Sequence, residues 1–166
     1  MKIFGKIIAA MVLALCGALG AQAQLPSVQV KDLSGKPVDT ATLSNGGKPF
    51  IISFWATWCK PCRRELKAIA DQYADWVEET GVKLYAVSVD KASDTAKVKP
   101  VVDAGGWEYE VLLDPSGDFQ RAMGASNVPH GIIVDGQGKV VESHGGYTEG
   151  SEEELIEKVR ELIKGK

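Results

Sequence analysis

Two cysteines separated by two residues, Cys59 and Cys62, carry the clearest chemistry in this sequence. They stand where an apolar run gives way to an amphipathic pattern, which indicates the junction of a strand and a helix. Free N–H groups and the helix dipole favour a thiolate at a helix N-terminus, and the thiolate is the form that attacks disulfides. We therefore predict a redox dithiol, in which Cys59 is the attacking, partly exposed thiol and Cys62 is the more buried, resolving thiol.

The residues around the cysteines suit this chemistry. Lys60 places a positive charge near the thiolate and favours the charged form. Pro61 lacks an N–H that the first helical turn would leave unpaired, and its fixed φ fits that turn. Trp55 and Trp58 flank the motif, and we expect them to shape the rim of the site.

A structural zinc site is the alternative interpretation of such a cysteine pair. Structural zinc has about four ligands, whereas the rest of the chain offers only Cys16, His130 and His144. We therefore expect no metal and no cofactor.

Residues 1–23 have the pattern of an export signal. Lys2 and Lys6 precede an apolar run over 7–15, and Ala21-Gln22-Ala23 fits a small-x-small cleavage site. We predict cleavage after Ala23, which leaves one domain over residues 24–166 in the periplasm or cell envelope.

Two other interpretations of this leader remain open. A retained membrane anchor would need roughly 20 apolar residues, and this run is short. A lipoprotein would be modified at Cys16, although Leu15 is not the small residue that usually precedes such a cysteine. Once the leader is removed, Cys59 and Cys62 are the only cysteines. The ring they close is too small to constrain much unfolded chain, which favours a redox role over a structural one.

The surrounding pattern alternates strands and helices. The nearly continuous apolar run over 50–55 is expected of a central strand covered on both faces. Apolar residues then recur every three or four positions over 63–79, a helix that Gly81 ends. A second apolar strand over 82–89 completes a parallel strand–helix–strand unit.

The remaining elements are shorter. We expect a hairpin over 28–38, a weak helix over 93–104, a strand over 109–113, a helix over 119–123, strands over 130–134 and 139–142, and a last helix opened by a capping box of Ser151 and Glu154. The net charge of −3 and the absence of a basic stripe or phosphate loop argue against nucleic acid as a partner.

These elements have the order of a thioredoxin fold, and several motifs resemble the TlpA/ResA group of envelope-located thiol–disulfide oxidoreductases. The motifs are FWATWCxPCRxE over 54–65, Val128-Pro129 before Asp135-x-x-Gly138-Lys139-Val140, and Asp32-Leu33-x-Gly35-Lys36. The resemblance covers the whole mature chain. It implies an α/β fold, with a central mixed sheet, helices on both faces and an N-terminal β-hairpin.

The resemblance also implies site residues. Val128-Pro129 would be a cis peptide bond lying against the disulfide, and Pro129 would keep metal away from the dithiol. The backbone of Val128 would be presented to a client strand, beside a substrate-binding rim that includes Trp58, Lys60 and Pro61.

Glu65 has two open interpretations. The resemblance implies a glutamate that takes part in the proton transfers of the dithiol, since the resolving thiol must lose a proton before it attacks. Alternatively, Glu65 only interacts with the helix dipole. Ser53 replaces the buried aspartate of thioredoxins proper, which leaves Glu65 as the nearest candidate base in sequence.

The two histidines depart from the pattern of the group. His130 and Gly131 replace the usual threonine-rich pair after the proline. His130 could tune the site near neutral pH, but we favour a side chain that points away from the sulfurs. We expect His144 on the surface.

The predicted activity is thiol–disulfide exchange with client proteins. The resemblance favours reduction of the clients, supplied with electrons by a membrane protein. A copper chaperone that holds Cu(I) with Cys59, Cys62 and His130 is the alternative. A peroxidase is a third interpretation. A peroxidatic cysteine requires proline and threonine residues around it, and Thr57 alone does not provide these surroundings. The sequence does not indicate the oligomeric state.

Overall fold

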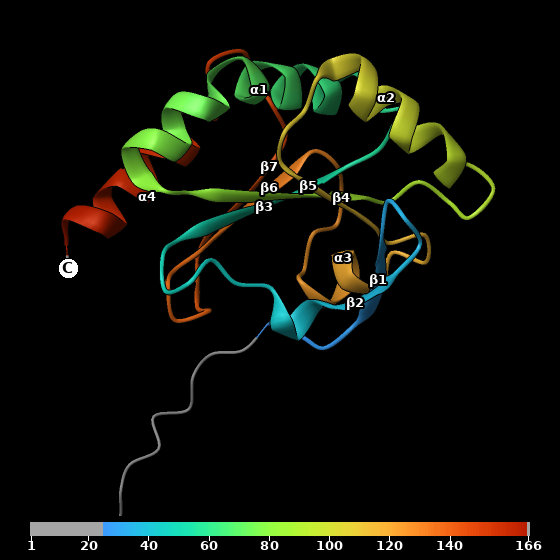
Figure 1. Ribbon diagram of the computed structural model, residues 1–166, viewed down its shortest axis with the longest axis horizontal. Coiled ribbons are helices and arrows are strands. Elements are labelled where there is room, and N and C mark those ends of the chain that lie inside the picture. Colours follow the sequence, from blue (N-terminus) through green and yellow to red (C-terminus); the bar gives the residue numbers. More distant parts are fainter. Residues whose placement is uncertain (1–24, 166) are drawn as a thin grey trace, which may run out of the picture.

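The computed structural model describes residues 25–165, which form one mixed β-sheet with helices on both faces (Figure 1). The strands are β1 (Gln29–Asp32), β2 (Pro37–Asp39), β3 (Phe50–Trp55), β4 (Lys83–Ser88), β5 (Glu110–Leu113), β6 (His130–Val134) and β7 (Val140–Gly145). The helices are η1 (Thr40–Thr42), α1 (Lys60–Thr80), η2 (Thr95–Lys97), α2 (Val98–Gly105), α3 (Asp118–Ala122) and α4 (Glu152–Lys164).

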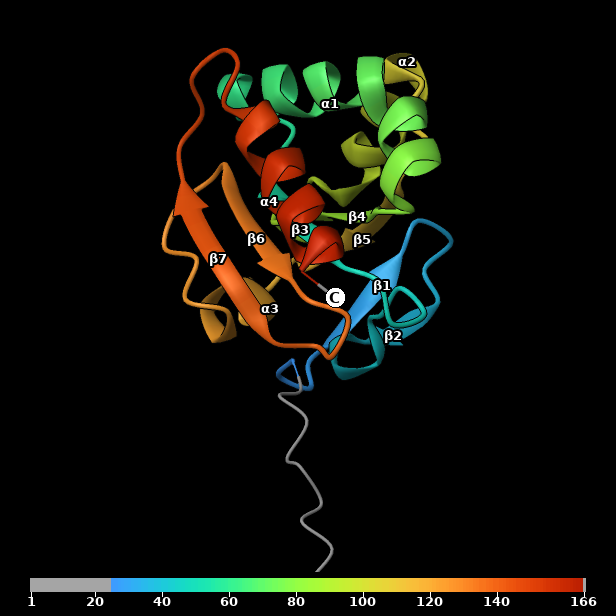
Figure 2. The same ribbon diagram turned by 90° about the vertical axis from the view of Figure 1, so that its left-hand side faces the viewer.

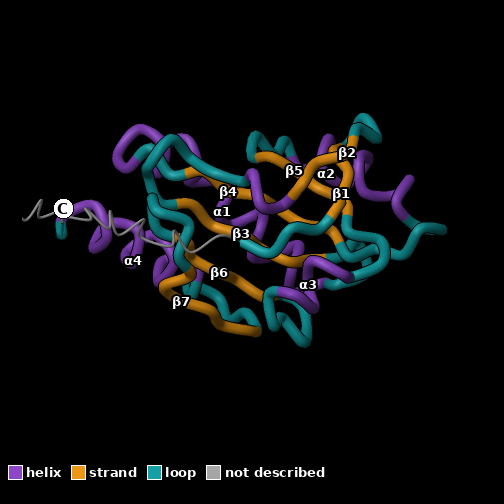
Figure 3. The backbone as a smooth tube through the Cα atoms, turned by 90° about the horizontal axis from the view of Figure 1, so that it is seen from below, coloured by secondary structure: helices purple, strands orange, loops and turns teal. Residues whose placement is uncertain are grey.

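The strand order within these residues is β2-β1-β5-β4-β3-β6-β7. Strand β3 is buried along its whole length, and it pairs in parallel with β4 and antiparallel with β6. Helices α1, α2 and α4 cover one face of the sheet, and α3 covers the other, which is seen from below in Figure 3. The predicted mixed sheet, the helices on both faces and the N-terminal hairpin are confirmed.

Two apolar cores fill the space on either side of the sheet. The core under α1, α2 and α4 contains both cysteines and an edge-to-face pair of Trp55 and Trp107, whose ring centroids are 5.0 Å apart. The core on the α3 side contains Phe54 and Phe119, with ring centroids 5.4 Å apart. The site is therefore built on a rigid strand that is packed from both faces.

Helix α1 is longer than predicted at its N-terminus. It begins at Lys60, directly after Cys59, and ends at Thr80, and the next residue, Gly81, has a φ of 66°, the left-handed conformation expected of a C-cap glycine. Its buried face matches the predicted apolar positions except at Val77, which is 41% exposed. Thr80 is buried instead, and its hydroxyl donates to the carbonyl of Trp76.

The predictions were less accurate for two other helices. The weak helix expected over 93–104 starts only at Val98, which places Pro100 in its first turn, where proline is tolerated. The capping box before α4 does not form. Ser151 has helical backbone angles of −71° and −13°, and its hydroxyl accepts from the N–H of Thr148 rather than from the helix.

The predicted signal peptide lies outside the described residues. Within residues 25–165, no helix is both long and apolar enough to cross a bilayer.

Candidate active site

The two cysteines form a disulfide at the point where β3 passes into α1. Cys59 is the N-cap of the helix and Cys62 lies in its first turn, with an S–S distance of 1.99 Å. The backbone N–H of Cys62 points to the sulfur of Cys59 at 3.3 Å. In the reduced protein, this N–H and the helix dipole would stabilise a thiolate on Cys59.

Both sulfurs lie in an apolar environment. Cys59 is 5% exposed and Cys62 is fully buried, so the order of exposure is the predicted one, although Cys59 is less exposed than expected. Trp58, Lys60 and Pro61 are exposed around them, and the Trp58 side chain is 70% exposed. An approaching client therefore reaches Cys59 before Cys62.

A buried carboxylate that sequence reasoning missed fixes the loop before the disulfide. Asp90 is fully buried and accepts hydrogen bonds from the N–H of Thr57 at 2.8 Å and from its hydroxyl at 2.6 Å. The hydroxyl of Ser88 donates to the same carboxylate at 2.8 Å. In the sequence, Asp90 could have been recognised by its position, because it is a charged residue directly after a buried strand. Asp90 ties the loop that carries Cys59 to the end of β4.

The segment before β6 contributes the other side of the rim. The Val128–Pro129 peptide bond is cis, as predicted, and Pro129 is buried. Val128 and Trp58 line the same surface groove, which also includes Lys91, Gln120 and Arg121. The backbone N–H and carbonyl of Val128 form no hydrogen bond with any residue in 25–165. Lys60 and Pro61 do not line this groove.

Glu65 lies on the buried face of α1, three residues after Cys62, and is 1% exposed. Burial raises its pKa from 4.5 to about 7, and the negative charge of Glu152 adds to this effect. The hydroxyl of Ser53, 3.5 Å from the carboxylate, opposes the rise in pKa. Glu65 can therefore gain or lose a proton near neutral pH, as a general base requires.

The two histidines lie on opposite faces of the β6–β7 ladder. His130 pairs with Gly145 and shares the α3 face with Ile132, whereas His144 pairs with Gly131. Nε2 of His130 is 2.8 Å from the hydroxyl of Ser143, and burial lowers the pKa of the ring.

This placement bears on two earlier interpretations. His130 is on the face opposite to the cysteines, which supports the side chain pointing away from them and leaves the copper interpretation without its third ligand. The predicted surface position of His144 was wrong, because its side chain is half-buried and its Nε2 is fully enclosed. Residues 25–165 contain no cluster of three or more potential metal ligands.

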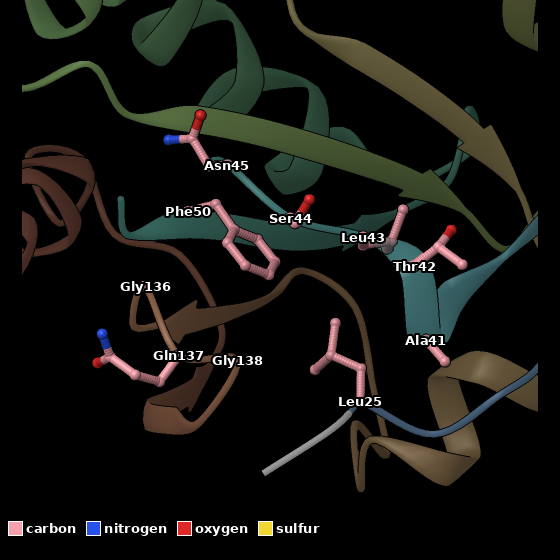
Figure 4. Close-up of a pocket in the computed structure, with 10 residues that line it drawn as sticks. All are labelled: Leu25, Ala41, Thr42, Leu43, Ser44, Asn45, Phe50, Gly136, Gln137 and Gly138. Carbon is pink, nitrogen blue, oxygen red and sulfur yellow. The ribbon is translucent and has the colours of Figure 1, made fainter. Parts of the chain in front are cut away.

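A separate pocket lies at the other end of β3 (Figure 4). Phe50 borders it and is the first residue of the strand, whereas the disulfide follows the last. At about 3.3 Å per residue, the strand separates the two places by more than about 15 Å. No ionisable side chain lines this pocket, whose residues are Leu25, Ala41, Thr42, Leu43, Ser44, Asn45, Phe50, Gly136, Gln137 and Gly138.

Comparison with known proteins agrees with this geometry. Residues 21–143 match the model of the AhpC/TSA family. The chain is also 31% identical over 137 residues to the thiol-disulfide oxidoreductase ResA of Bacillus thuringiensis subsp. konkukian (strain 97-27), which covers 82% of this chain and 76% of ResA. The chain belongs to the AhpC/TSA family. Its similarity to the ResA proteins shows that it is a thiol–disulfide oxidoreductase of this family.

Solved structures place this AhpC/TSA protein among the thioredoxin-like folds. It is similar to an uncharacterized thioredoxin-like protein from Porphyromonas gingivalis, with 63% identity, a TM-score of 0.76, and coverage of 86% of this chain and 93% of the other. It is also similar to MTB dsbF, with 27% identity, a TM-score of 0.68, and coverage of 84% of this chain and 97% of the other. The predicted fold and the resemblance to the TlpA/ResA group are confirmed.

The role of Asp90 in this oxidoreductase can be tested by stability. Asp90→Ala leaves the N–H of Thr57 and the hydroxyl of Ser88 without their buried acceptor, so we expect a loss of about 2–4 kcal/mol in unfolding free energy. Asp71→Ala, which removes only an exposed ion pair with Lys67, should cost less than about 1 kcal/mol. Urea unfolding of the oxidised variants provides the measurement, and equal losses in the two variants would contradict the proposed anchor.

Glu65 should make the stability of this oxidoreductase depend on pH. Its folded pKa of about 7 lies above its ordinary value of 4.5, so the folded state binds more protons than the unfolded state between these values. Stability should therefore fall as pH rises from about 4.5 to about 7, by about 3 kcal/mol. In Glu65→Gln this contribution should be missing. Urea titrations of both proteins at several pH values in this range measure the difference between their unfolding free energies. That difference should stay constant if burial leaves the pKa of Glu65 unchanged.

Proposed function

We propose that this protein acts in the cell envelope as a reductase of client disulfides, with Cys59 as nucleophile and Cys62 as resolving thiol. The observation that carries the proposal is the arrangement at the start of α1. The sulfur of Cys59 faces the N–H of Cys62, and a buried carboxylate of raised pKa follows on the same helix face.

The reaction begins from the reduced protein. The Cys59 thiolate attacks one sulfur of a client disulfide, forms a mixed disulfide and releases the other client sulfur as a thiolate. Glu65 then accepts the proton of the Cys62 thiol. The Cys62 thiolate attacks the sulfur of Cys59 and releases the second client thiolate. The client gains two electrons, and the protein keeps the Cys59–Cys62 disulfide.

The groove beside Cys59 supports binding of an extended client segment. Trp58 offers an exposed aromatic surface, and Val128 offers backbone groups that are not used within the described residues. An extended client can pair with such groups as an additional strand does. Pro129 holds this segment in place, and Lys60 and Pro61 complete the exposed rim.

Separate arguments support the location in the cell envelope and the direction of the reaction, which is reduction of the client. Residues 1–23 have the pattern of an export signal, and the relatives named ResA share the dithiol chemistry. Because oxidising compartments maintain disulfides, a reductase there needs electrons from a membrane protein. Complete burial of Cys62 in an apolar core disfavours its thiolate, which destabilises the reduced dithiol and so favours reduction of the client.

The order of attack can be tested by trapping. The reduced Cys62→Ser variant of residues 24–166 should accumulate a mixed disulfide through Cys59 when mixed with a peptide that contains one disulfide, because resolution is blocked. The matched variant Cys59→Ser should give at least about tenfold less adduct, since a fully buried thiol is protected from reaction. Mass spectrometry under non-reducing conditions measures the adduct. An adduct mainly on Cys62 would reverse the assignment, and no adduct on either cysteine would contradict the proposed function.

A further inference from the structure

The groove that contains Trp58 and Val128 lies to one side of the disulfide. Its walls come from the loop before α1, the segment after β4, helix α3 with the turn before it, and the segment before β6. Helix α3 lies across the sheet from α1 (Figure 2), and no residue of α1 lines the groove. Client recognition in this groove and the proton chemistry of Glu65 on α1 therefore use different surfaces.

The charged side chains that line this groove are both positive. They are Lys91 and Arg121, and no carboxylate of residues 25–165 lines the groove with them. The chain as a whole has the opposite balance, with 22 acidic and 19 basic residues. The groove is therefore a local positive patch on an acidic protein, and such a patch attracts anionic groups.

The position of Lys91 is fixed by the same anchor that holds the loop of Cys59. Asp90 is fully buried, and its carboxylate accepts from the N–H of Thr57 at 2.8 Å. The next residue, Lys91, is exposed and lines the groove together with Trp58. Because the bond between Asp90 and Thr57 joins the end of β4 to the loop before the disulfide, Lys91 is held close to the residues that carry the nucleophile.

The ammonium group of Lys91 has no ion-pair or hydrogen-bond partner among residues 25–165. Asp94, three residues further on, pairs with Lys97 instead. The pKa of Asp94 is lowered mainly by the hydrogen bond from Lys97 and least by the charge of Lys91. Arg121, by contrast, is held by Asp118 at 2.5 Å. Lys91 is thus the cation of the groove that remains available to a client.

Two buried carboxylates belong to the segments that form the groove, but neither lines it. Asp90 binds Thr57, and Asp114 is 1% exposed and accepts from the N–H of Gln120 at 2.9 Å. Both carboxylates are therefore occupied by backbone N–H groups inside the protein. A client in the groove meets the exposed ammonium group of Lys91 before it meets either of them.

We propose that Lys91 is a specificity-determining residue, which selects client segments that carry a carboxylate side chain close to the reacting cysteine. The client pairs with the free backbone groups of Val128, and the side chain of a nearby Asp or Glu binds the ammonium group of Lys91. The preference applies to acids within about three residues of the cysteine, which is about 10 Å of extended chain. This inference rests on the proposed function, because it concerns clients of the same dithiol.

The test compares three peptides of equal length, each with one internal disulfide. The residues two positions outside the two cysteines are both Glu, both Gln or both Lys. Reduced protein, residues 24–166, is mixed with each peptide in about 0.1 M salt, which screens charges beyond about 10 Å. Acid quenching, alkylation and mass spectrometry give the second-order rate constant of peptide reduction. The Glu peptide should react at least about fivefold faster than the Lys peptide, and the ratio should approach one in about 1 M salt.

Two matched variants locate the effect. Lys91→Glu should reverse the preference, so that the Lys peptide reacts faster than the Glu peptide. Lys139→Glu makes the same change of charge in the turn between β6 and β7, next to Gly138 of the pocket at the other end of β3, and it should keep the wild-type preference. Comparing the ratios between proteins cancels the reactivity of the dithiol and that of the peptide disulfides.

The outcomes separate the inference from the proposed function. An identical ratio in the wild-type and Lys91→Glu proteins would overturn the inference. Equal changes in Lys91→Glu and Lys139→Glu would also overturn it, because they would report the net charge alone. In both cases, reduction of all three peptides leaves the proposed function standing. If no peptide is reduced, the proposed function fails, and the inference fails with it.

Discussion

The placement of Cys59 at the N-cap of α1 is the constraint on which the rest of the site depends. The helix supplies an N–H that faces the sulfur at 3.3 Å and the positive end of a dipole, and no mobile group has to be ordered to provide either. The helix can do this only if the strand before it is fixed. Strand β3 is buried on both faces, and Asp90 holds the connecting loop by hydrogen bonds to Thr57.

The same burial that makes the scaffold rigid creates the proton chemistry. Glu65 is withdrawn from water in a core of apolar side chains, which raises its pKa to about 7 at a cost to stability. An exposed glutamate on the other side of α1 would titrate too low to accept a proton from a thiol and release it again near neutral pH. We therefore regard burial of Glu65 as the physical link between the fold and the resolving step.

Much of the fold was predictable because local patterns and tertiary structure agree. The apolar run of β3, the periodicity of α1 and the glycine that ends α1 each favour one structure. The hairpin turn was equally predictable, since Asp32 accepts from the N–H groups of Ser34 and Lys36 and Gly35 adopts a φ of 86°. The cis bond before Pro129 came only from resemblance, because local sequence does not select it.

Val77 fits the helical pattern but is 41% exposed, and Ser151 has helical backbone angles and accepts from the N–H of Thr148 instead of capping α4. The errors at Asp90 and His144 share a cause, which is that long-range packing decides their positions. Both residues are positioned by partners more than ten residues away in the sequence: Asp90 by Thr57, and His144 by Gly131. No pattern within a single element contains that information.

The reduction potential of the Cys59–Cys62 pair tests the central claim of a client reductase most directly. Equilibration of residues 24–166 with a glutathione or dithiothreitol buffer, with the reduced fraction read by mass spectrometry after thiol alkylation, gives the value. The account predicts a potential of about −250 mV or lower, in the region of thioredoxin, because Cys62 is fully buried in an apolar core that disfavours its thiolate. A value near about −120 mV would describe an oxidant that makes disulfides in its clients, and it would contradict the proposed direction.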